Sequence, residues 1–550
     1  MKFNSPLAAF LHWEENRPDE VYLRQPINGA MVEYTFKQAG EEARKVAGYL
    51  HTLDLAPNSH VALISKNCAH WIMADLAIMM AGYVSIPLYP TISASTIRQI
   101  LEHSESKAIF VGKLDDFSGQ KSGIPDMPMI SMKVYGVEDG KSWEEIVDEN
   151  EPLQTIHSPK SEELMSIIYT SGTTGNPKGV MHSVGSFTLV SETSVEILPL
   201  PPHPRFFSYL PLSHIAERII AEMGSLFRGG VVTFPESLQT FASDLAAVQP
   251  HIFFGVPRIY AKFQEGVLNK MPQKKLNIML SIPIIRGIVK KKITEKLGLS
   301  EADLIYSGAA PLATSVIDWY AKLGITVMQG YGMTEDCILS HYNLPGANRV
   351  GSVGRPIKGA QTKLSPEGEI CIKSDCLTMG YFKEPEMTAE LFDEDGFLKT
   401  GDIGEYDHDG FLFITGRVKD QFKTDKGKYI SPAPIELEVS KNEDIELMCI
   451  VGTGVPQPIA LIVPSEKGLA KSNEELSASL IASIEAVNPG LQTYEKIEKA
   501  IVMKEVWSID NGLLTPTFKT KRSQIEKIHM HMYSTWFEQE GKVIFEKENS

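Results

Sequence analysis

Residues 164–179 read LMSIIYTSGTTGNPKG, an apolar run that leads into a loop of small, hydroxylated and basic residues. The run Leu164–Ile168 is typical of a buried strand. The glycines that follow permit positive φ and close approach of the backbone to a ligand, and successive loop N–H groups can form an anion-binding nest. The candidate phosphate contacts are Thr170, Ser171, Gly172, Thr173, Thr174 and Lys178. The stretch therefore predicts a strand followed by a polyphosphate-binding loop.

This loop differs from a Walker A motif. No Ser or Thr follows Lys178, and the spacing is one residue longer than GxxxxGK[ST]. Taken alone, a loop of this composition is more often an ordinary surface turn. The phosphate-binding interpretation therefore depends on what the rest of the chain contains.

Helix and strand patterns alternate on the N-terminal side of this loop. Residues 41–53 have the periodicity of an amphipathic helix, and residues 61–64 form a short apolar run. A second pair follows, with an apolar helix at 71–80 and a strand at 84–88. Further buried strands are expected at 108–111 and 231–234. The alternation predicts an α/β fold whose layers surround a largely parallel sheet.

The pattern changes after residue 350. Short apolar segments at 368–372 and 410–414 are separated by Gly, Pro and Asp, which predicts an antiparallel, barrel-like portion. A last α/β segment follows, with a strand at 449–451 and a helix at 474–487. We expect a large N-terminal domain at 1–416 and a small C-terminal domain at 417–550, since 550 residues exceed one hydrophobic core.

The composition excludes several classes of protein. The formal net charge of −16 argues against a nucleic-acid partner. Five scattered cysteines without a CxxC pair resemble neither a disulfide framework nor a zinc site, so a reducing cytoplasm is expected. The N-terminus lacks the apolar core of a signal peptide. Residues 71–88 are apolar, but Asp75 and a Gly-Tyr break favour a buried helix and strand over a membrane span.

Eight segments, in order, resemble the motifs of the adenylate-forming superfamily, which includes acyl-CoA synthetases, peptide-synthetase adenylation domains and firefly-type luciferases. They are residues 169–179, 208–215, 255–258, 307–312, 329–335, 400–402, 416–420 and 514–519. The resemblance implies ATP-dependent activation of a carboxylic acid. The acid would attack the α-phosphate, form an acyl-adenylate and release pyrophosphate.

Both reacting groups are anions, so this chemistry needs positive charge at the reacting centre. The resemblance assigns the bridging lysine to Lys519, with Lys521 as an alternative because the segment can be aligned either way. Glu335, together with Thr334, would hold a Mg²⁺ ion that offsets phosphate charge. His214 would border the acyl or thioester pocket, although a histidine in an apolar stretch is more often structural.

The remaining nucleotide contacts follow from the same resemblance. Tyr331 and Gly332 belong to the adenine motif, and the segment Gly308, Ala309 and Ala310 would let its backbone approach the other face of the base. Asp402 would accept the ribose hydroxyls and Arg417 would donate to them. Without this context, Tyr331 would be interpreted as a core tyrosine and Asp402 as a turn residue.

A thiol must replace pyrophosphate in the second half-reaction. The resemblance implies that the C-terminal domain rotates about Asp420 and that the loop 423–429 moves toward coenzyme A. Gly427 would let the backbone of that loop line a narrow channel. The simpler interpretation of 423–429 is a flexible linker.

The strings at 210–218, 254–260 and 427–432 most resemble long-chain and bubblegum-type fatty acyl-CoA synthetases, which implies a fatty acid, ATP and CoA as substrates. Two alternatives remain open: an acyl-AMP ligase that loads a carrier protein, and an inactive adenylate-binding regulator. Residues 281–293 predict a helix, which is more simply a core-facing helix with solvated lysines than a contact with anionic membrane. The sequence leaves the oligomeric state unassigned.

Overall fold

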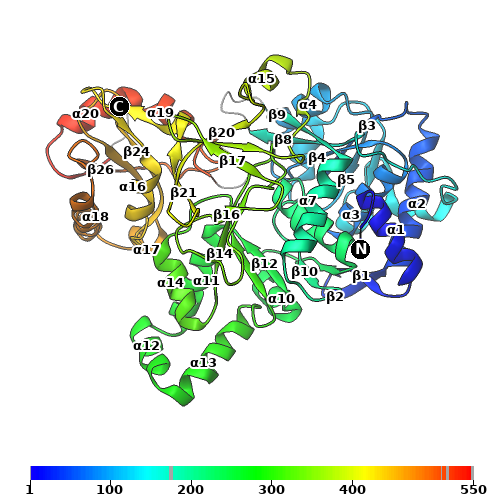
Figure 1. Ribbon diagram of the computed structural model, residues 1–550, viewed down its shortest axis with the longest axis horizontal. Coiled ribbons are helices and arrows are strands. Elements are labelled where there is room, and N and C mark those ends of the chain that lie inside the picture. Colours follow the sequence, from blue (N-terminus) through cyan, green and yellow to red (C-terminus); the bar gives the residue numbers. More distant parts are fainter. Residues whose placement is uncertain (1, 172–176, 510, 516–518, 547–550) are drawn as a thin grey trace. The chain divides into compact units, whose positions relative to one another are not determined.

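The computed structural model describes residues 2–171, 177–509, 511–515 and 519–546 (Figure 1). The chain divides into two compact units. Unit 1 comprises residues 1–310, 316–362 and 372–398, and unit 2 comprises residues 311–315, 363–371 and 399–550. Both units mix helices and strands, which confirms the α/β class. The predicted functional boundary at residue 416 stays a prediction.

The largest sheet of unit 1 carries the glycine-rich loop. Its strand order is β19-β9-β8-β4-β3-β5-β6-β7. The strands are β3 (His60–Ile64), β4 (Val84–Leu88), β5 (Ala108–Val111), β6 (Met129–Ser131), β7 (Lys141–Ser142), β8 (Leu164–Ser171), β9 (Pro177–Ser183) and β19 (Gly380–Tyr381). Pairing is parallel from β8 to β7 and antiparallel at β8–β9 and β9–β19. The predicted parallel sheet is therefore confirmed.

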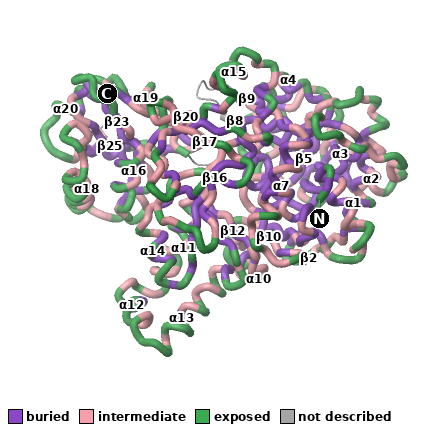
Figure 2. Tube along the Cα trace, in the orientation of Figure 1, coloured by how far each residue is buried: buried purple, intermediate pink, exposed green. Residues whose placement is uncertain are grey.

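The helix that precedes β4 is buried on every side. All residues of α3 (Ala69–Met80) and of β4 are buried, and Figure 2 shows this region in purple. The neighbouring α2 (Phe36–Thr52) begins with a capping box in which Thr35 and Gln38 satisfy each other's backbone N–H groups. The prediction of a buried helix and strand at 71–88 is confirmed. In the part of the chain that the structure describes, no helix is both long and apolar enough to cross a membrane.

Two smaller sheets complete the strands of unit 1. One has the order β10-β11-β1-β2, and the other has the order β12-β13-β14-β15-β16. The strands are β1 (Val21–Ile27), β2 (Ala30–Thr35), β10 (Arg205–Phe207), β11 (Val231–Thr233), β12 (Ile252–Gly255), β13 (Leu304–Ser307), β14 (Met328–Tyr331), β15 (His341–Tyr342) and β16 (Arg355–Pro356). The pairs β12–β13 and β13–β14 are parallel, so their carboxyl ends meet at one edge.

The principal further helices of unit 1 surround these sheets. They are α1 (Pro6–Asn16), α4 (Ala94–His103), α6 (Trp143–Glu149), α7 (Val184–Ile197), α9 (Gly224–Arg228), α10 (Phe241–Val248), α11 (Pro257–Lys270), α14 (Thr314–Leu323) and α15 (Pro385–Glu390). A π-helical turn, η3 (Arg218–Met223), lies between α8 (Ile215–Glu217) and α9.

The helices α12 (Gln273–Ser281) and α13 (Pro283–Lys296) form a hairpin whose surface is mostly exposed (Figure 2). Leu276 is the buried residue of α12, and Val289 is the buried residue of α13. The prediction of a core-facing helix at 281–293 is therefore wrong. Its apolar residues recur at helical spacing, but Val289 is the buried one, whereas Ile284 and Ile288 are 82% and 64% exposed.

Unit 2 contains two sheets and a hairpin. Most of the sheet β17-β18-β20-β21 belongs to this unit, as do the sheet β24-β25-β26-β27 and the hairpin β22–β23. The strands are β17 (Gln361–Leu364), β18 (Glu369–Lys373), β20 (Leu398–Tyr406), β21 (Leu412–Arg417), β22 (Phe422–Lys423), β23 (Tyr429–Ile430), β24 (Ile445–Val451), β25 (Ile459–Pro464), β26 (Lys499–Val502) and β27 (Val543–Phe545). Its helices include α16 (Pro432–Val439), α17 (Glu466–Leu469), α18 (Asn473–Val487), α19 (Arg522–His529) and α20 (Tyr533–Glu538).

Candidate active site

The hairpin β8–β9 brings the two ends of the glycine-rich loop together. Thr170 of β8 pairs directly with Lys178 of β9. Gly172, Thr173 and Thr174 lie outside the described residues, as does the side chain of Ser171. The Lys178 ammonium lies 5.0 Å from the centroid of the Tyr381 ring, within the range of a cation–π contact.

Tyr381 connects the loop hairpin to Glu335. The Tyr381 hydroxyl donates a hydrogen bond of 2.8 Å to the Glu335 carboxylate, and the backbone N–H of Thr378 donates 2.7 Å to the Glu335 carbonyl. Burial, and then the Glu335 charge, raises the pKa of Tyr381, so the phenol stays protonated and donates. The structure thus brings Lys178 and Glu335 to the same ring, although 156 residues separate them in the chain.

Tyr381 was not among the site residues predicted from the sequence. A single tyrosine in the segment 378–382 carries no local signal that separates it from a core aromatic residue. Its position follows from β19 pairing with β9, where Tyr381 lies opposite Val180.

The segment around Glu335 is buried and has an unusual backbone. Thr334 is 9% exposed and Glu335 is 8% exposed. Cys337 and Ile338 both have a φ of +55°, a left-handed conformation that non-glycine residues seldom adopt. Asp336 accepts a 2.8 Å hydrogen bond from the Met333 N–H and thereby closes the turn. Such strain persists where the surrounding structure enforces it, as at functional sites.

The predicted adenine segments show a similar feature. Ala309 has a φ of +66°. Tyr331 ends β14, and its ring lies 6.2 Å from the ring of His341, centroid to centroid. The parallel pair β13–β14 places residues 307–310 and 329–332 at the same edge of the sheet. These two predicted segments are therefore neighbours, as a shared base-binding role requires.

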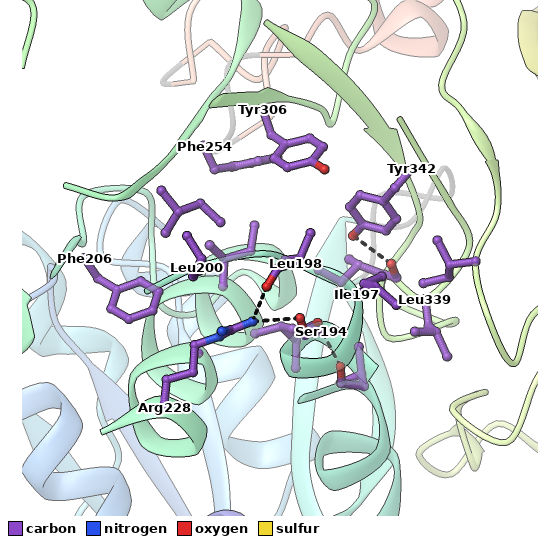
Figure 3. A pocket seen from close by; sticks show the side chains of 17 residues that line it. Ser194, Ile197, Leu198, Leu200, Phe206, Arg228, Phe254, Tyr306, Leu339 and Tyr342 are labelled. Carbon is purple, nitrogen blue, oxygen red and sulfur yellow. Dashed lines mark hydrogen bonds between the residues drawn. The ribbon is translucent and has the colours of Figure 1, made fainter. Parts of the chain in front are cut away.

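A largely apolar pocket of about 660 Å³, including space open to solvent, lies behind these segments (Figure 3). The lining residues come from α7, the chain after it, β10, η3, α9, the five-stranded sheet and the loops around residues 338 and 357: Val190, Ser194, Ile197, Leu198, Leu200, Phe206, Ile219, Ile220, Gly224, Arg228, Ile252, Phe254, Tyr306, Ile338, Leu339, Tyr342 and Ile357.

The pocket wall touches the glycines of the nucleotide segments. A Cβ at Gly308 would lie 3.0 Å from the Phe254 ring, and one at Gly330 would lie 2.8 Å from the Tyr342 ring. A Cβ at Gly332 would lie 2.6 Å from the Cα of Ile338. A side chain at any of these three positions would crowd the pocket wall. Glycine is therefore needed for the predicted nucleotide-binding segments to lie directly against the pocket.

Arg228 is the cationic residue of the pocket lining. One of its nitrogens, Nη2, donates to the carbonyls of Ser194, Val195 and Leu198 at 2.9, 3.2 and 2.8 Å, which caps the C-terminus of α7. In the view of Figure 3, Arg228 lies across the pocket from Phe254 and Tyr306. Burial lowers the pKa of Arg228 to about 10. It remains a cation near neutral pH, beside an otherwise apolar cavity.

His214 has a local structural role. It is the N-cap of α8, and its Nδ1 accepts a 3.2 Å hydrogen bond from the Ala216 N–H. It is absent from the described residues that line the pocket. Its predicted place at an acyl or thioester pocket stays a prediction.

In unit 2, Asp402 and Arg417 face each other across β20 and β21. They are a directly paired couple in the ladder, and Arg417 Nε lies 2.5 Å from Asp402 Oδ1. The Asp402 N–H donates to the Thr400 hydroxyl at 3.1 Å, and Gly401 has a φ of +73°. The predicted ribose pair is thus held as one unit by strand register.

Lys519 belongs to the same unit as this pair. Its backbone N–H donates to the Thr515 hydroxyl at 3.0 Å, and the Thr515 N–H donates to the Lys519 carbonyl at 2.8 Å. Part of its side chain is exposed, yet desolvation by the surrounding protein is the main cause that lowers its pKa to about 8. The Arg417 guanidinium lowers the pKa further, and the Asp402 carboxylate opposes this effect.

Lys521 has a different environment. It is the residue before α19, and its backbone N–H donates to the Leu513 carbonyl at 2.8 Å. The charges of Arg417 and Asp402 act on Lys519, two residues before Lys521.

Asp420 and Gly427 lie in ordered backbone. Asp420 ends a 3-10 turn, η4 (Val418–Asp420), between β21 and β22. Gly427, with a φ of +75°, forms the turn of the hairpin β22–β23, and its N–H donates to the Thr424 carbonyl at 2.9 Å. The alternative in which residues 423–429 are a flexible linker is therefore wrong, because these hydrogen bonds define a hairpin.

The described residues contain no group of three or more His, Cys, Asp or Glu that could hold a metal ion alone. Glu335 fits a different kind of site. Mg²⁺ is commonly held by one or two carboxylates together with substrate phosphates and water. A buried carboxylate close to a phosphate-loop lysine suits that arrangement.

The chain is similar to known enzymes over most of its length. Residues 10–382 match the family model of the AMP-binding enzyme, and residues 419–528 match that of the AMP-binding enzyme C-terminal domain. Long chain acyl-CoA synthetase 7, peroxisomal, from Arabidopsis thaliana is 30% identical over 94% of this chain and 84% of its own. Long-chain-fatty-acid–CoA ligase ACSBG2 from Gallus gallus is 28% identical over 94% of this chain and 79% of its own.

Solved structures agree in fold. The adenylation domain of a carboxylate reductase from Mycobacterium chelonae has a TM-score of 0.82 at 22% identity, covering 97% of this chain and 91% of its own. Anthranilate CoA ligase AuaEII, in complex with anthranoyl-AMP, has a TM-score of 0.78 at 20% identity, covering 96% of this chain and 98% of its own. The chain belongs to the AMP-binding enzyme family, as an AMP-forming acid–thiol ligase related to the long-chain acyl-CoA synthetases.

Proposed function

We propose that the protein is a long-chain fatty acid–CoA ligase. ATP and the fatty acid give acyl-AMP and pyrophosphate, and the thiol of CoA then displaces AMP. The observation that carries this proposal is the apolar pocket, whose wall lies directly against Gly308, Gly330 and Gly332 of the nucleotide segments. A carboxylate at the mouth of this pocket would have its alkyl chain in the apolar cavity.

The pocket lining favours an aliphatic acid. Val, Leu and Ile side chains of α7, the chain after it, η3 and the loops around residues 338 and 357 dominate it, and each methylene transferred from water gains about 0.8 kcal/mol. Arg228 is the cation of this lining, and its Nη2 is already bonded to three carbonyls of α7. An acid with a polar body would gain less from these walls.

In the first half-reaction, a carboxylate oxygen forms a bond to the α-phosphorus while the bond from that phosphorus to the pyrophosphate oxygen breaks. We assign Lys178 to the phosphates and Lys519 to the bridge between the carboxylate and the α-phosphate. A magnesium ion at Glu335 would supply charge neutralisation on the phosphates, with the carboxylate oriented by the Tyr381 hydroxyl. Asp402 and Arg417 would hold the ribose.

Lys519 is preferred to Lys521 as the bridging group. Its pKa responds to both members of the ribose pair, so its ammonium lies in the electrostatic reach of Asp402 and Arg417. A lysine that bridges two anions next to the ribose must lie there.

In the second half-reaction, the CoA sulfur attacks the acyl carbon and the bond to the AMP oxygen breaks. We assign the hairpin β22–β23, with Gly427 at its turn, to the CoA channel and Asp420 to the hinge that exchanges the two half-reactions. His214 is assigned to the border of the acyl or thioester site. Free CoA is the proposed acceptor and the cytoplasm the proposed location, although some relatives are named as peroxisomal proteins.

A pyrophosphate-release assay tests the proposal. The purified chain is given Mg·ATP and saturated or unsaturated acids from acetate to oleate, with and without CoA. Turnover should peak among the longer acids and depend on CoA. Turnover only with a phosphopantetheinyl carrier would support the carrier-loading alternative. ATP binding without pyrophosphate release from any acid would support the inactive regulator.

A further inference from the structure

The tip of the α12–α13 hairpin presents a cluster of exposed isoleucines. Ile278, Ile282, Ile284 and Ile288 are 63%, 40%, 82% and 64% exposed. Exposed large apolar side chains also occur elsewhere among the described residues, for example Leu238 at 84% and Leu469 at 66%. The four isoleucines, however, lie within eleven residues of chain and therefore form a local apolar cluster at the hairpin.

Basic residues flank this apolar tip. Residues 271–296 contain seven Lys and Arg side chains and one acidic residue, Glu295, in a chain whose formal net charge is −16. The basic residues are Lys274, Lys275, Arg286, Lys290, Lys291, Lys292 and Lys296. The hairpin is therefore a strongly positive element on an acidic protein, and it is attracted to anionic surfaces that the rest of the chain repels.

The base of the hairpin is anchored, so its tip has a defined position within unit 1. The Trp319 indole donates 3.0 Å to the Gln273 side chain, and the Gln249 amide donates 2.7 Å to the Glu295 carbonyl. The buried residues Leu276 and Val289 lie closer to the base of the hairpin than the tip residues 281–284 do. Figure 1 shows the two helices as an adjacent pair that extends away from α10 and β12.

We propose that this hairpin docks the protein on the surface of an anionic phospholipid bilayer. The isoleucines would enter the boundary between headgroups and acyl chains, and the lysines and Arg286 would pair with lipid phosphates. This binding goes beyond the ligase activity and does not depend on it. Docking would place the protein at the bilayer, the phase into which free fatty acids partition.

The arrangement favours a bilayer over a protein partner. The isoleucines lie at the end of a hairpin, and such a tip enters a fluid apolar layer more readily than it fills the long groove used by an amphipathic helix. A second copy of the chain is disfavoured because two hairpins with an excess of six positive charges would repel each other. An acidic protein remains as an outcome of the test.

Vesicle flotation with the full-length chain tests this surface. Vesicles of phosphatidylcholine alone are compared with vesicles that contain phosphatidylserine, at low and at physiological salt. The double variant Ile284→Asp, Ile288→Asp removes the apolar tip, and the triple variant Arg286→Gln, Lys291→Gln, Lys292→Gln removes basic charge. Leu469→Asp is the matched control, because Leu469 is 66% exposed on α17 of unit 2.

The wild type and Leu469→Asp should float with the phosphatidylserine vesicles, and both hairpin variants should bind at least tenfold more weakly. Thermal melting confirms that each variant is folded. Failure of the wild type to bind anionic vesicles at low salt would overturn the proposal, as would unchanged binding of the Asp double variant. A change of oligomeric mass without vesicle binding, or retention on an acidic protein alone, would also overturn it.

Discussion

At the scale of single residues, Lys519 has a titration that falls in an easily assayed range. Its pKa is lowered to about 8, so the ammonium is charged below that pH and neutral above it. A neutral amine cannot bridge a carboxylate and a phosphate electrostatically. The rate of pyrophosphate release should therefore fall as pH rises through about 8.

Lys519→Arg keeps the charge to high pH because guanidinium stays protonated above pH 12 or so. This variant should be slower, since its geometry differs, but it should lose the fall near pH 8. Lys521→Arg is the matched control and should keep the wild-type profile. If the control, rather than Lys519→Arg, removes the alkaline fall, the bridging role belongs to Lys521.

Tyr381 is a second residue whose role depends on one hydrogen bond. Tyr381→Phe removes the 2.8 Å donor to the buried Glu335 carboxylate and preserves the ring beside Lys178. An unpaired buried acceptor costs about 1–3 kcal/mol, so we expect roughly a tenfold loss of kcat/KM for Mg·ATP. Steady-state kinetics at several magnesium concentrations measure it.

Tyr49→Phe is the control for this change, because Tyr49 lies on α2, outside the proposed site, and also has a lysine, Lys141, over its ring at 5.3 Å. It should leave the apparent affinity for Mg·ATP unchanged. Wild-type kinetics in Tyr381→Phe at every magnesium concentration would contradict the positioning role of its hydroxyl.

At the scale of elements, one buried cation joins three segments of unit 1. Arg218 of η3 contacts Asp75 of α3 at 2.6 Å, Glu222 at 3.2 Å and the Ser166 hydroxyl of β8 at 2.6 Å. The side chains of Arg218, Asp75 and Glu222 are fully buried. Burial, together with the nearby Asp75 charge, raises the pKa of Glu222 and so favours its protonated form.

Arg218→Met should destabilise the fold by about 3–5 kcal/mol, because it leaves buried carboxyl groups without their cation. Urea denaturation measures the change. Adding Asp75→Asn and Glu222→Gln should recover part of the loss, since the remaining groups are then neutral. Arg98→Met, at an exposed ion pair, is the control and should change stability by less than about 1 kcal/mol. A loss equal to that of Arg98→Met would contradict the account.

The end of α7 sets the size of the proposed acyl pocket. Leu198 follows the helix as its C-cap and lines the cavity. Leu198→Trp should fill part of the space and move the preferred acid to a shorter chain, while the rate with medium-chain acids is retained. Competition between acids of different length measures the shift. Leu469→Trp, on the exposed surface of unit 2, should leave the preference unaltered.

At the scale of the whole molecule, the predicted machinery is divided between two compact units. Lys178, Tyr331 and Glu335 belong to unit 1, whereas Asp402 and Lys519 belong to unit 2. The proposed reaction uses both sets. Asp420, in the turn between β21 and β22, is therefore the position at which a backbone change should separate the two half-reactions.

Asp420→Pro fixes φ at this turn and should slow thioester formation at least tenfold more than adenylate formation. Single-turnover assays with and without CoA measure the steps separately. Asp420→Ala, which leaves the backbone torsion free, should affect both steps less. Equal losses of the two steps in Asp420→Pro would refute the hinge role.

Much of the fold could be predicted because local patterns and tertiary packing agree. The strand at 84–88 was predicted with its observed limits, and the helix expected at 474–487 is α18, Asn473–Val487. The helix expected to begin at residue 41 begins at Phe36, because the capping box at Thr35 extends it. Apolar periodicity locates such elements well, and caps decide their ends.

The candidate site could be predicted only in part. Motif order predicted Glu335, Asp402 and Lys519 as site residues, but Tyr381 reaches Glu335 through a strand pairing that no local pattern encodes. The interpretation of residues 281–293 was wrong for a related reason. Ile284 and Ile288 look like core residues in the sequence, and only the three-dimensional structure shows that no described element covers them.

By itself, the sequence determined the chemistry that the chain can offer: a glycine-rich loop, buried strands of alternating α/β layers, and charged residues in the order of a known family. These properties depend on residue types and short-range spacing, which local sterics and hydrophobicity control. The tertiary structure alone decided which distant side chains contact the same tyrosine, where an apolar cavity lies, and which isoleucines face solvent. Those outcomes depend on strand order and on packing between segments far apart in the chain. The local periodicity of apolar residues carries no information about such pairings.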